Sequence, residues 1–357
     1  MNDTLLVTGG AGFIGSALVR QLLDETDARV VVLDKLTYSG NLASLREVED
    51  HPRYEFVEGD VCDRELVASL FEDHAPRGVF HLAAESHVDR SIDGPMEFVE
   101  TNVVGTVTLL DEALDYWKAL DDDDREDFRF LHVSTDEVFG ELGDDDFFTE
   151  ETPYDPRNPY AASKASADMF VRSWESTYDL PVLVTNCANN YGPRQFPEKL
   201  IPVVILKSLR GEPIPVYGDG SNIRDWIHVE DHARGLHRVF EDGRVGETYN
   251  IGAQVERSNL RLVKTICSIL DERLDDPAVD EHASLIEFVT DRPGHDQRYA
   301  IDPEKMMTEL DWSPRESFDS GMGKTVDWYL DNLDWCSEVL EGEYDLERVG
   351  KRTGDSS

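Results

Sequence analysis

Basic residues are scarce in this 357-residue chain, where 34 Lys plus Arg stand against 75 Asp plus Glu, for a formal net charge of −41. A nucleic-acid binder needs a basic surface, and an anionic membrane attracts basic segments, so this balance excludes both classes. The 40% hydrophobic and 9% aromatic content argues against disorder, the other common meaning of excess acid. The composition predicts an acidic globular protein of one large or two smaller domains.

Lysine is the rarest charged residue, with nine lysines against 25 arginines. Acid-rich, lysine-poor surfaces are typical of proteins from organisms with molar intracellular salt, where self-repulsion is screened within a few ångströms. An ordinary acidic enzyme is the alternative interpretation of the same composition. We expect a salt-adapted organism.

Cysteines and long apolar segments are also sparse. The four cysteines lie far apart without a Cys-x-x-Cys pair, which favours buried reduced thiols over disulfides or a zinc site. Residues 4–8 open directly on a strand-like run, and the apolar stretch 200–206 contains Pro202 and is too short to span a bilayer. We therefore expect a cytoplasmic protein.

Short β-branched runs alternate with helical patterns through the first half of the chain. The predicted strands are 5–8, 30–33, 54–57, 78–83, 128–134 and 181–186. Between them, stretches such as 14–23 and 98–117 carry apolar residues at spacings of three and four. This alternation predicts an α/β fold with a doubly wound parallel sheet of the Rossmann type.

After about residue 190, closely spaced prolines predict a smaller mixed α/β region that binds substrate. We expect residues 1–189, about 221–257 and 309–335 in the larger domain that carries the sheet, about 190–220 and 258–308 in the smaller domain, and a polar tail at 338–357. The acidic runs 121–124 and 144–146 are expected in loops, as solvated charge rather than a metal site.

Three glycines follow the first predicted strand. Gly9, Gly12 and Gly15 suit a tight turn, a close approach of a pyrophosphate and close helix packing, and the following helix offers its free N–H groups to phosphate. Their spacing is Gly-x-x-Gly-x-x-Gly, so a glycine-rich turn without a ligand is the alternative.

Two acids at strand ends strengthen the nucleotide interpretation. Asp34 ends the second predicted strand, 19 residues after Gly15, where an acid hydrogen-bonds the adenosine ribose 2′-hydroxyl and repels a 2′-phosphate. Asp60 follows the third strand and can reach the adenine edge. The predicted cofactor is NAD.

Tyr160 and Lys164 lie one helical turn apart, which suits a general base for an alcohol, although a surface pair is the alternative. Ionising a tyrosine near neutral pH costs about 4 kcal/mol. One cation at about 5 Å contributes about 3 kcal/mol at an effective dielectric constant of about 20. Base function therefore needs Lys164 together with the positive ring of the oxidised cofactor.

Another acid pair, Asp136 and Glu137, follows the fifth predicted strand, at the sheet edge where ligands bind. Neighbouring carboxylates can divide acid and base roles when their surroundings separate their pKa values. In a chain this acidic, an ordinary loop pair is the alternative.

Several motifs together resemble one known family over about residues 4–332. The supporting segments are 9–16, 34–38, 81–92, 134–140, 158–164, 189–193, 196–202, 216–220, 224–226 and 291–295. They resemble the extended short-chain dehydrogenase/reductases and, within them, the dTDP-glucose 4,6-dehydratases. The specific part is Thr135-Asp136-Glu137, since similar GDP-mannose dehydratases and UDP-glucuronate decarboxylases carry Thr-Ser-Glu there and 4-epimerases lack the acid pair.

The resemblance implies a hydro-lyase that acts on dTDP-glucose with a recycled NAD. Tyr160 would take the C4 hydroxyl proton while hydride leaves C4, with Thr135 hydrogen-bonded to that oxygen. Glu137 would remove the C5 proton, and protonated Asp136 would assist loss of the C6 hydroxyl as water. Return of hydride to C6 would give 4-keto-6-deoxyglucose, a precursor of rhamnose or another deoxysugar.

The resemblance also implies that the larger domain binds NAD and the smaller domain the sugar nucleotide, with binding residues at the matching positions. For NAD these are Gly9, Gly12, Phe13, Ile14, Gly15, Asp34, Lys35, Leu36, Thr37, Asp60, Val61, Leu82, Ala83, Ala84, Ser86, Thr101, Tyr160, Lys164 and Asn190. For the sugar nucleotide they are Ser86, Thr135, Asn189, Lys199, Leu200, Pro215, Tyr217, Arg224, Asn259, Arg292 and His295. Lys199 and Arg224 suit the diphosphate, because an acidic protein needs local cations for an anionic ligand.

Helical stretches 98–117 and 161–178 resemble those that pair across the family's homodimer as a four-helix bundle, although both could instead pack within one chain. Departures from the family are small: Phe139 stands where many members have Tyr, and Ala188 where many have Ser. Two other functions stay open, a related UDP-sugar epimerase or decarboxylase and a non-catalytic NAD-binding sensor.

Overall fold

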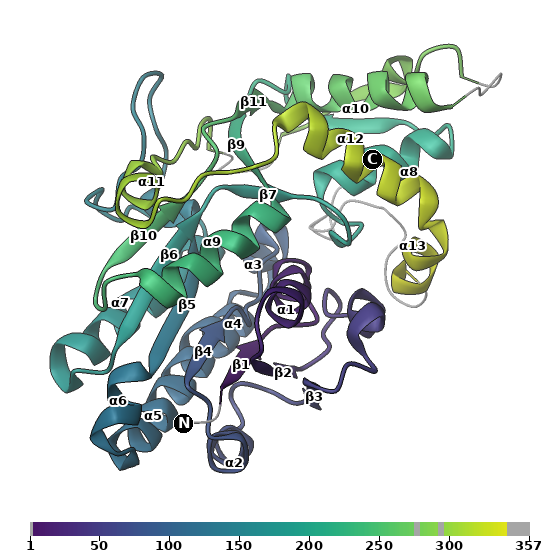
Figure 1. Cartoon of the computed structure of the whole chain (residues 1–357). Coiled ribbons are helices and arrows are strands. Elements are labelled where there is room, and N and C mark those ends of the chain that lie inside the picture. Colours follow the sequence, from purple (N-terminus) through teal and green to yellow (C-terminus); the bar gives the residue numbers. More distant parts are fainter. Residues whose placement is uncertain (1–2, 275–278, 292–295, 341–357) are drawn as a thin grey trace.

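The computed structural model of the chain describes residues 3–274, 279–291 and 296–340. At its centre is a seven-stranded sheet in the order β10-β6-β5-β4-β1-β2-β3, with every pair parallel (Figure 1). The strands are β1 (Thr4–Thr8), β2 (Arg29–Asp34), β3 (Tyr54–Glu58), β4 (Gly78–His81), β5 (Arg129–Thr135), β6 (Val182–Cys187) and β10 (Thr248–Ile251). The predicted doubly wound α/β fold is confirmed.

Helices cover both faces of this sheet (Figure 1). On one face, α1 (Phe13–Glu25) packs against α9 (Val229–Asp242). On the other, α5 (Thr106–Ala119) lies between α2 (Arg64–His74) and α7 (Pro159–Tyr178). Because both faces are covered, central strands such as β2 are apolar and buried along almost their whole length.

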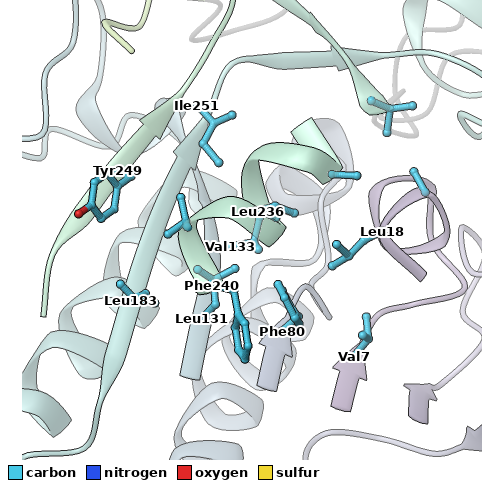
Figure 2. Close-up of a cluster of buried hydrophobic side chains, with 14 of the residues drawn as sticks. Val7, Leu18, Phe80, Leu131, Val133, Leu183, Leu236, Phe240, Tyr249 and Ile251 are labelled. Carbon is cyan, nitrogen blue, oxygen red and sulfur yellow. The ribbon is translucent and has the colours of Figure 1, made fainter. Parts of the chain in front are cut away.

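The core beneath α1 and α9 shows how strand and helix side chains interlock. Figure 2 shows Val7, Phe80 and Leu131 on successive strands below side chains of the two helices. The rings of Phe80 and Phe240 stack at 4.4 Å between centroids, so α9 lies close against β4. This packing holds the strands, and therefore their carboxyl ends, in fixed positions.

A second core lies beside the main sheet. It contains the three-stranded sheet β11-β9-β7 and the parallel pair β12-β8, formed by β7 (Asn189–Tyr191), β8 (Ile214–Tyr217), β9 (Ile223–His228), β11 (Glu256–Ser258) and β12 (Ile286–Val289). The helices that share it are α8 (Leu200–Leu209), α10 (Asn259–Arg273), α12 (Phe318–Asp331) and α13 (Leu333–Leu340). The boundaries predicted between the two domains stay a prediction.

Shorter elements complete the fold. They are the 3-10 helices η1 (Leu42–Val48), η3 (Asp136–Phe139) and η4 (His282–Leu285), the π-helical turn η2 (Val99–Gly105), and the α-helices α3 (Val88–Asp93), α4 (Pro95–Phe98), α6 (Asp122–Asp127) and α11 (Glu304–Leu310). No helix in the described ranges is long and apolar enough to cross a bilayer.

Most of the predicted elements are present, with local differences. All six predicted strands form, although β4 ends at His81 rather than at residue 83, and β10 was not predicted as a strand. The predicted helix 98–117 is divided, because η2 inserts a π-helical turn between α4 and α5.

The prediction of a loop at residues 121–124 was wrong. Asp121 caps α6 by accepting a hydrogen bond from the backbone N–H of Asp124, 3.0 Å away, and three acids occupy the first helical turn. Acids are favourable there because they oppose the positive end of the helix dipole. The other acidic run, 144–146, lies in a loop as predicted.

Candidate active site

A cavity of about 320 Å³ opens where the parallel strands end. Its lining comes from the segments that follow β1, β2, β3, β4, β5 and β6, together with the first turns of α1 and α7. This is the edge of a doubly wound sheet at which ligands bind, because loops diverge there and helix N-termini point toward the opening.

The glycine turn after β1 forms one end of this cavity. Gly9 has φ +73°, and a Cβ there would lie 2.6 Å from the backbone nitrogen of Ala83. A Cβ on Gly15 would lie 2.1 Å from the carbonyl oxygen of Gly9. Gly12 precedes α1 without a side-chain cap, so the helix N–H groups face the cavity unshielded by a side chain. The turn therefore fits a pyrophosphate.

Asp34 ends β2 at the same end of the cavity. Its carboxylate accepts hydrogen bonds of 2.9 Å from the backbone N–H groups of Ala11 and Leu36, and burial raises its pKa. Nearby, Lys35 Nζ lies 2.7 Å from Asp60 Oδ2. Although burial acts in the opposite direction, this contact with Lys35 lowers the pKa of Asp60. Two fixed acids thus face the space that an adenosine would occupy.

The predicted NAD residues converge on this cavity. Except for Leu36, which supplies its N–H to Asp34, every one of them contributes to the lining. The glycine cradle and the strand-end acid both fit a dinucleotide. NAD contacts at the individual positions stay a prediction.

All five predicted catalytic residues line the same cavity, at its other end. Tyr160 lies in the first turn of α7 because Asn158 caps that helix, accepting a 2.8 Å hydrogen bond from Ala161 N–H, and proline follows the cap. The Nδ2 group of Asn158 lies 3.3 Å from Glu137 Oε2 and donates to it. The cap therefore also ties the start of α7 to the acid pair.

Asp136 and Glu137 lie in different surroundings although they are adjacent in the chain. The Asp136 side chain is buried, and its Oδ2 atom has no hydrogen-bond partner among the described residues. Burial, reinforced by the charge of Glu137, raises the pKa of Asp136 well above its usual range. Glu137 is only partly buried and is hydrogen-bonded to Asn158. Burial therefore singles out Asp136 as the group of this pair that can act as a protonated acid.

The Tyr160 phenol is neutral in the protein alone. Burial and then the negative charge of Glu137 raise its pKa well above the usual value, while a hydrogen bond with Thr135 acts in the opposite direction. Lys164 is buried too, and its Nζ donates a 2.8 Å hydrogen bond to the Val133 carbonyl. Ionising Tyr160 therefore requires a further positive charge at its end of the cavity.

The predicted sugar-nucleotide residues fall into three groups. Ser86, Thr135, Asn189 and Lys199 line the cavity. Leu200, Pro215, Tyr217, Arg224 and Asn259 lie on the neighbouring elements α8, β8, β9 and α10 and do not line it. Arg292 and His295 lie outside the described residues.

Arg224 is held in place beside the cavity. Its guanidinium donates to the carbonyl oxygens of Ile223 and Asp296, at 2.7 and 2.9 Å, and lies over the Tyr299 ring at 4.2 Å. Its positive charge favours the ionised form of Asp136, but burial has the larger effect, so the pKa of Asp136 is still raised. Arg224 therefore places a fixed positive charge close to the catalytic acids.

Glu198 and Asn158 are two residues at this site that sequence reasoning did not single out. Glu198 lines the cavity and is buried, and burial raises its pKa. It lies inside a motif that we used only for Lys199, so its charge and neighbours were a usable signal. Asn158 was recognisable as a helix cap before Pro159, but its bond to Glu137 depends on tertiary structure.

Comparison with known proteins places this geometry in a family. Residues 6–325 match the family model described as GDP-mannose 4,6 dehydratase. A dTDP-glucose 4,6-dehydratase of Neisseria meningitidis serogroup B is 57% identical over 349 residues, which cover 97% of this chain and 98% of that protein.

Solved structures agree with the sequence matches. The dTDP-glucose 4,6-dehydratase of Bacillus anthracis, solved in complex with NAD, superposes with a TM-score of 0.84 at 43% identity, over 94% of this chain and 99% of that one. The UDP-glucose 4-epimerase of Thermotoga maritima, solved with UDP-glucose, has a TM-score of 0.80 at 30% identity, over 92% and 99%. The chain belongs to the nucleotide-sugar 4,6-dehydratase family, among the dTDP-glucose 4,6-dehydratases.

Proposed function

We propose that this protein is an NAD-dependent dTDP-glucose 4,6-dehydratase that forms dTDP-4-keto-6-deoxyglucose. One observation carries the proposal: Asp136 and Glu137 lie in one cavity with Tyr160 and Lys164. Of the two acids, Asp136 is buried, and burial raises its pKa. Loss of water needs both an acid and a base beside the sugar, in addition to the residues that handle the C4 hydroxyl.

Tyr160 and Thr135 act at C4 of the sugar. NAD bound against the glycine turn supplies the hydride acceptor and donor. Tyr160, made more acidic by Lys164 and the oxidised cofactor, accepts the C4 hydroxyl proton, and Thr135 holds the same oxygen by a hydrogen bond. The family relationship and the shared cavity support these roles.

Glu137 and Asp136 act at C5 and C6. Once C4 is a ketone, the C5 proton is acidic enough for a carboxylate base, and Glu137 removes it. Asp136, held protonated by burial, gives its proton to the leaving C6 hydroxyl, which departs as water. Return of hydride from the reduced cofactor to C6 and of a proton to C5 would then give 4-keto-6-deoxyglucose, the precursor of rhamnose or another deoxysugar.

The sugar nucleotide extends from this acid pair toward the second core. Ser86, Asn189 and Lys199 border it in the cavity, and Asn189 Oδ1 is buried without a hydrogen-bond partner among the described residues. The fixed charge of Arg224 suits the diphosphate. Leu200, Pro215, Tyr217, Asn259, Arg292 and His295 complete the proposed contacts.

Incubation of the protein with dTDP-glucose in molar KCl, without added NAD, tests this function by mass spectrometry. Loss of one water from the sugar nucleotide is the expected result, with NAD retained from expression and recycled. Conversion of a UDP-sugar without loss of water would favour a related epimerase or decarboxylase, for which Asp136 has no role. NAD binding without turnover of dTDP-, UDP- or GDP-sugars would favour a sensor.

We also propose that the protein is a homodimer. Apolar side chains on the face formed by α3, α4, η2 and α7 are exposed, including Met96 at 65%, Val104 at 49% and Met169 at 53%. Sedimentation equilibrium should show a dimer that Met169→Asp converts to monomer. Phe288→Asp, at a 57% exposed apolar position on β12, is the matched control and should stay dimeric.

Finally, we infer a salt-rich cytoplasm as the setting. The net charge of −41 and the scarcity of lysine support salt adaptation, and the four free cysteines, three of them buried, support a reducing compartment. The melting temperature should rise as KCl approaches molar concentration. A melting temperature that does not change with KCl would contradict salt adaptation.

A further inference from the structure

A buried network extends from Lys164 away from the substrate. The Lys164 Nζ atom lies 3.4 Å from His132 Nε2, and that nitrogen lies 3.1 Å from Asp168 Oδ1. All three side chains are at most 4% exposed. Asp168 is four residues after Lys164 on α7 and eight after Tyr160, so the three lie along one face of that helix.

Asp168 also joins α7 to the strand that carries the acid pair. Its Oδ2 atom accepts hydrogen bonds from Ser134 Oγ at 2.7 Å and from the Tyr154 hydroxyl at 2.8 Å. Ser134 directly precedes Thr135 at the end of β5. The carboxylate of Asp168 thus ties α7, which carries the proposed base Tyr160, to the end of β5, which leads into the proposed acid pair.

An ammonium group buried this deeply needs a negative partner to stay charged. Burial lowers the pKa of Lys164, and the charge of Asp168 acts against that effect. Burial acts to raise the pKa of Asp168, but contact with His132, the charge of Lys164 and the hydrogen bond from Ser134 lower it below the usual value. Asp168 is therefore ionised. His132 between them is neutral at physiological pH, because burial and then the charge of Lys164 lower its pKa to about 4.

We propose that Asp168 is a positioning residue whose negative charge, acting across the His132 ring, holds Lys164 in its charged form. This inference rests on the proposed roles of Tyr160 and Lys164 and extends them by one residue. Without the charge of Asp168, Lys164 would release its proton at a lower pH and could no longer favour the Tyr160 phenolate.

Several other groups that titrate face Lys164. They are His81 on β4, His132 on β5, Cys187 on β6 and Asp168 on α7, and Tyr160 lies one turn before Lys164 on the same helix. Burial lowers the pKa of His81 and raises that of Cys187, so both are neutral near pH 7 in the folded protein. Asp168 is therefore the ionised carboxylate of this group.

The first test compares the free energy of unfolding of the NAD-saturated wild type and Asp168→Asn between pH 7 and 9. In the folded variant Lys164 has lost its proton, and on unfolding it takes the proton up again. Higher pH opposes this uptake, so the unfolding equilibrium constant of the variant should fall as pH rises, by up to about tenfold per pH unit relative to wild type. Adding Lys164→Met to Asp168→Asn should remove this difference. A pH-independent loss of stability in Asp168→Asn would overturn the proposal.

The second test measures kcat for dTDP-glucose over the same pH range. The alkaline decline of kcat should move to lower pH in Asp168→Asn, by about one to three pH units. Tyr154→Phe removes one hydrogen bond to Asp168 but keeps its charge, so its alkaline decline should stay where it is in wild type. An unmoved decline in Asp168→Asn would contradict the proposal.

If Asp168→Asn does not fold, Asp168→Ser, which also removes the charge, takes its place, with the same direction of change expected and a pH-independent loss counting against the proposal. The stability test does not depend on catalysis. The two proposals can therefore fail separately. If Tyr160→Phe keeps full activity, Tyr160 is not the base. If the unfolding stability of Asp168→Asn still changes with pH as expected, the pairing of Asp168 with Lys164 stands.

Discussion

The cofactor end and the substrate end of the cavity are built in different ways. At the cofactor end, backbone atoms of the glycine turn and acids at strand ends lie in short, continuous segments on one sheet. At the substrate end, Asn189 and Lys199 line the cavity, but Arg224 and Tyr217 lie on β9 and β8 of the second core. The proposed cofactor end is thus built largely from rigid backbone, and the proposed substrate end from side chains brought together from distant segments.

The largest effect should come from Glu137→Gln, which removes the proposed C5 base but leaves the C4 residues in place. Dehydration should fall by about 10² to 10⁴-fold, while C4 oxidation continues. Reduced nicotinamide should therefore accumulate, as absorbance spectroscopy would show. Glu126→Gln, at an exposed acid on α6, is the control and should keep wild-type activity. Turnover at the wild-type rate would rule out Glu137 as the base.

Gly15→Ala should damage the cofactor end specifically. Its Cβ would lie 2.1 Å from the Gly9 carbonyl oxygen, so the backbone must shift, at a cost of about 1–3 kcal/mol in stability. Less NAD should remain bound after purification, as chromatography of the released nucleotide would measure. At Gly143 a Cβ meets no atom within 4 Å, so Gly143→Ala is the matched control. Equal NAD content in both variants would show that the turn tolerates the shift.

Arg224→Met should affect the substrate end alone. Loss of a charged hydrogen-bonding group costs about 1.5–3 kcal/mol, so KM for dTDP-glucose should rise by about 10 to 150-fold. The amount of bound NAD should not change. Arg210→Met, on the exposed end of α8, controls for the loss of one positive charge. If both variants lost NAD as well, the two ends of the cavity would not be separable.

The smallest effect should follow Asp34→Asn, which keeps the size of the side chain and removes its charge. NAD affinity should fall by about tenfold, because a neutral amide oxygen is a weaker acceptor for a ribose hydroxyl. The preference for NAD over NADP should fall as well, since the 2′-phosphate is no longer repelled. Calorimetric titration of both cofactors measures the change, and an unaltered ratio of their affinities would contradict the role of Asp34.

Sequence alone therefore determined six of the seven strands of the main sheet and the proposed cofactor edge. Alternating apolar strands and amphipathic helices allow few other folds. The glycine turn, the acid Asp34 at a strand end and the Tyr160/Lys164 pair can each be recognised from a short stretch of sequence. Tertiary structure decided the rest. The raised pKa of Asp136 depends on its burial. The side chain of Asn158 bonds to Glu137, 21 residues away in the chain, and Asp168 contacts His132, 36 residues away. Such contacts between distant segments have no local pattern, because they exist only once the helices have packed on the sheet.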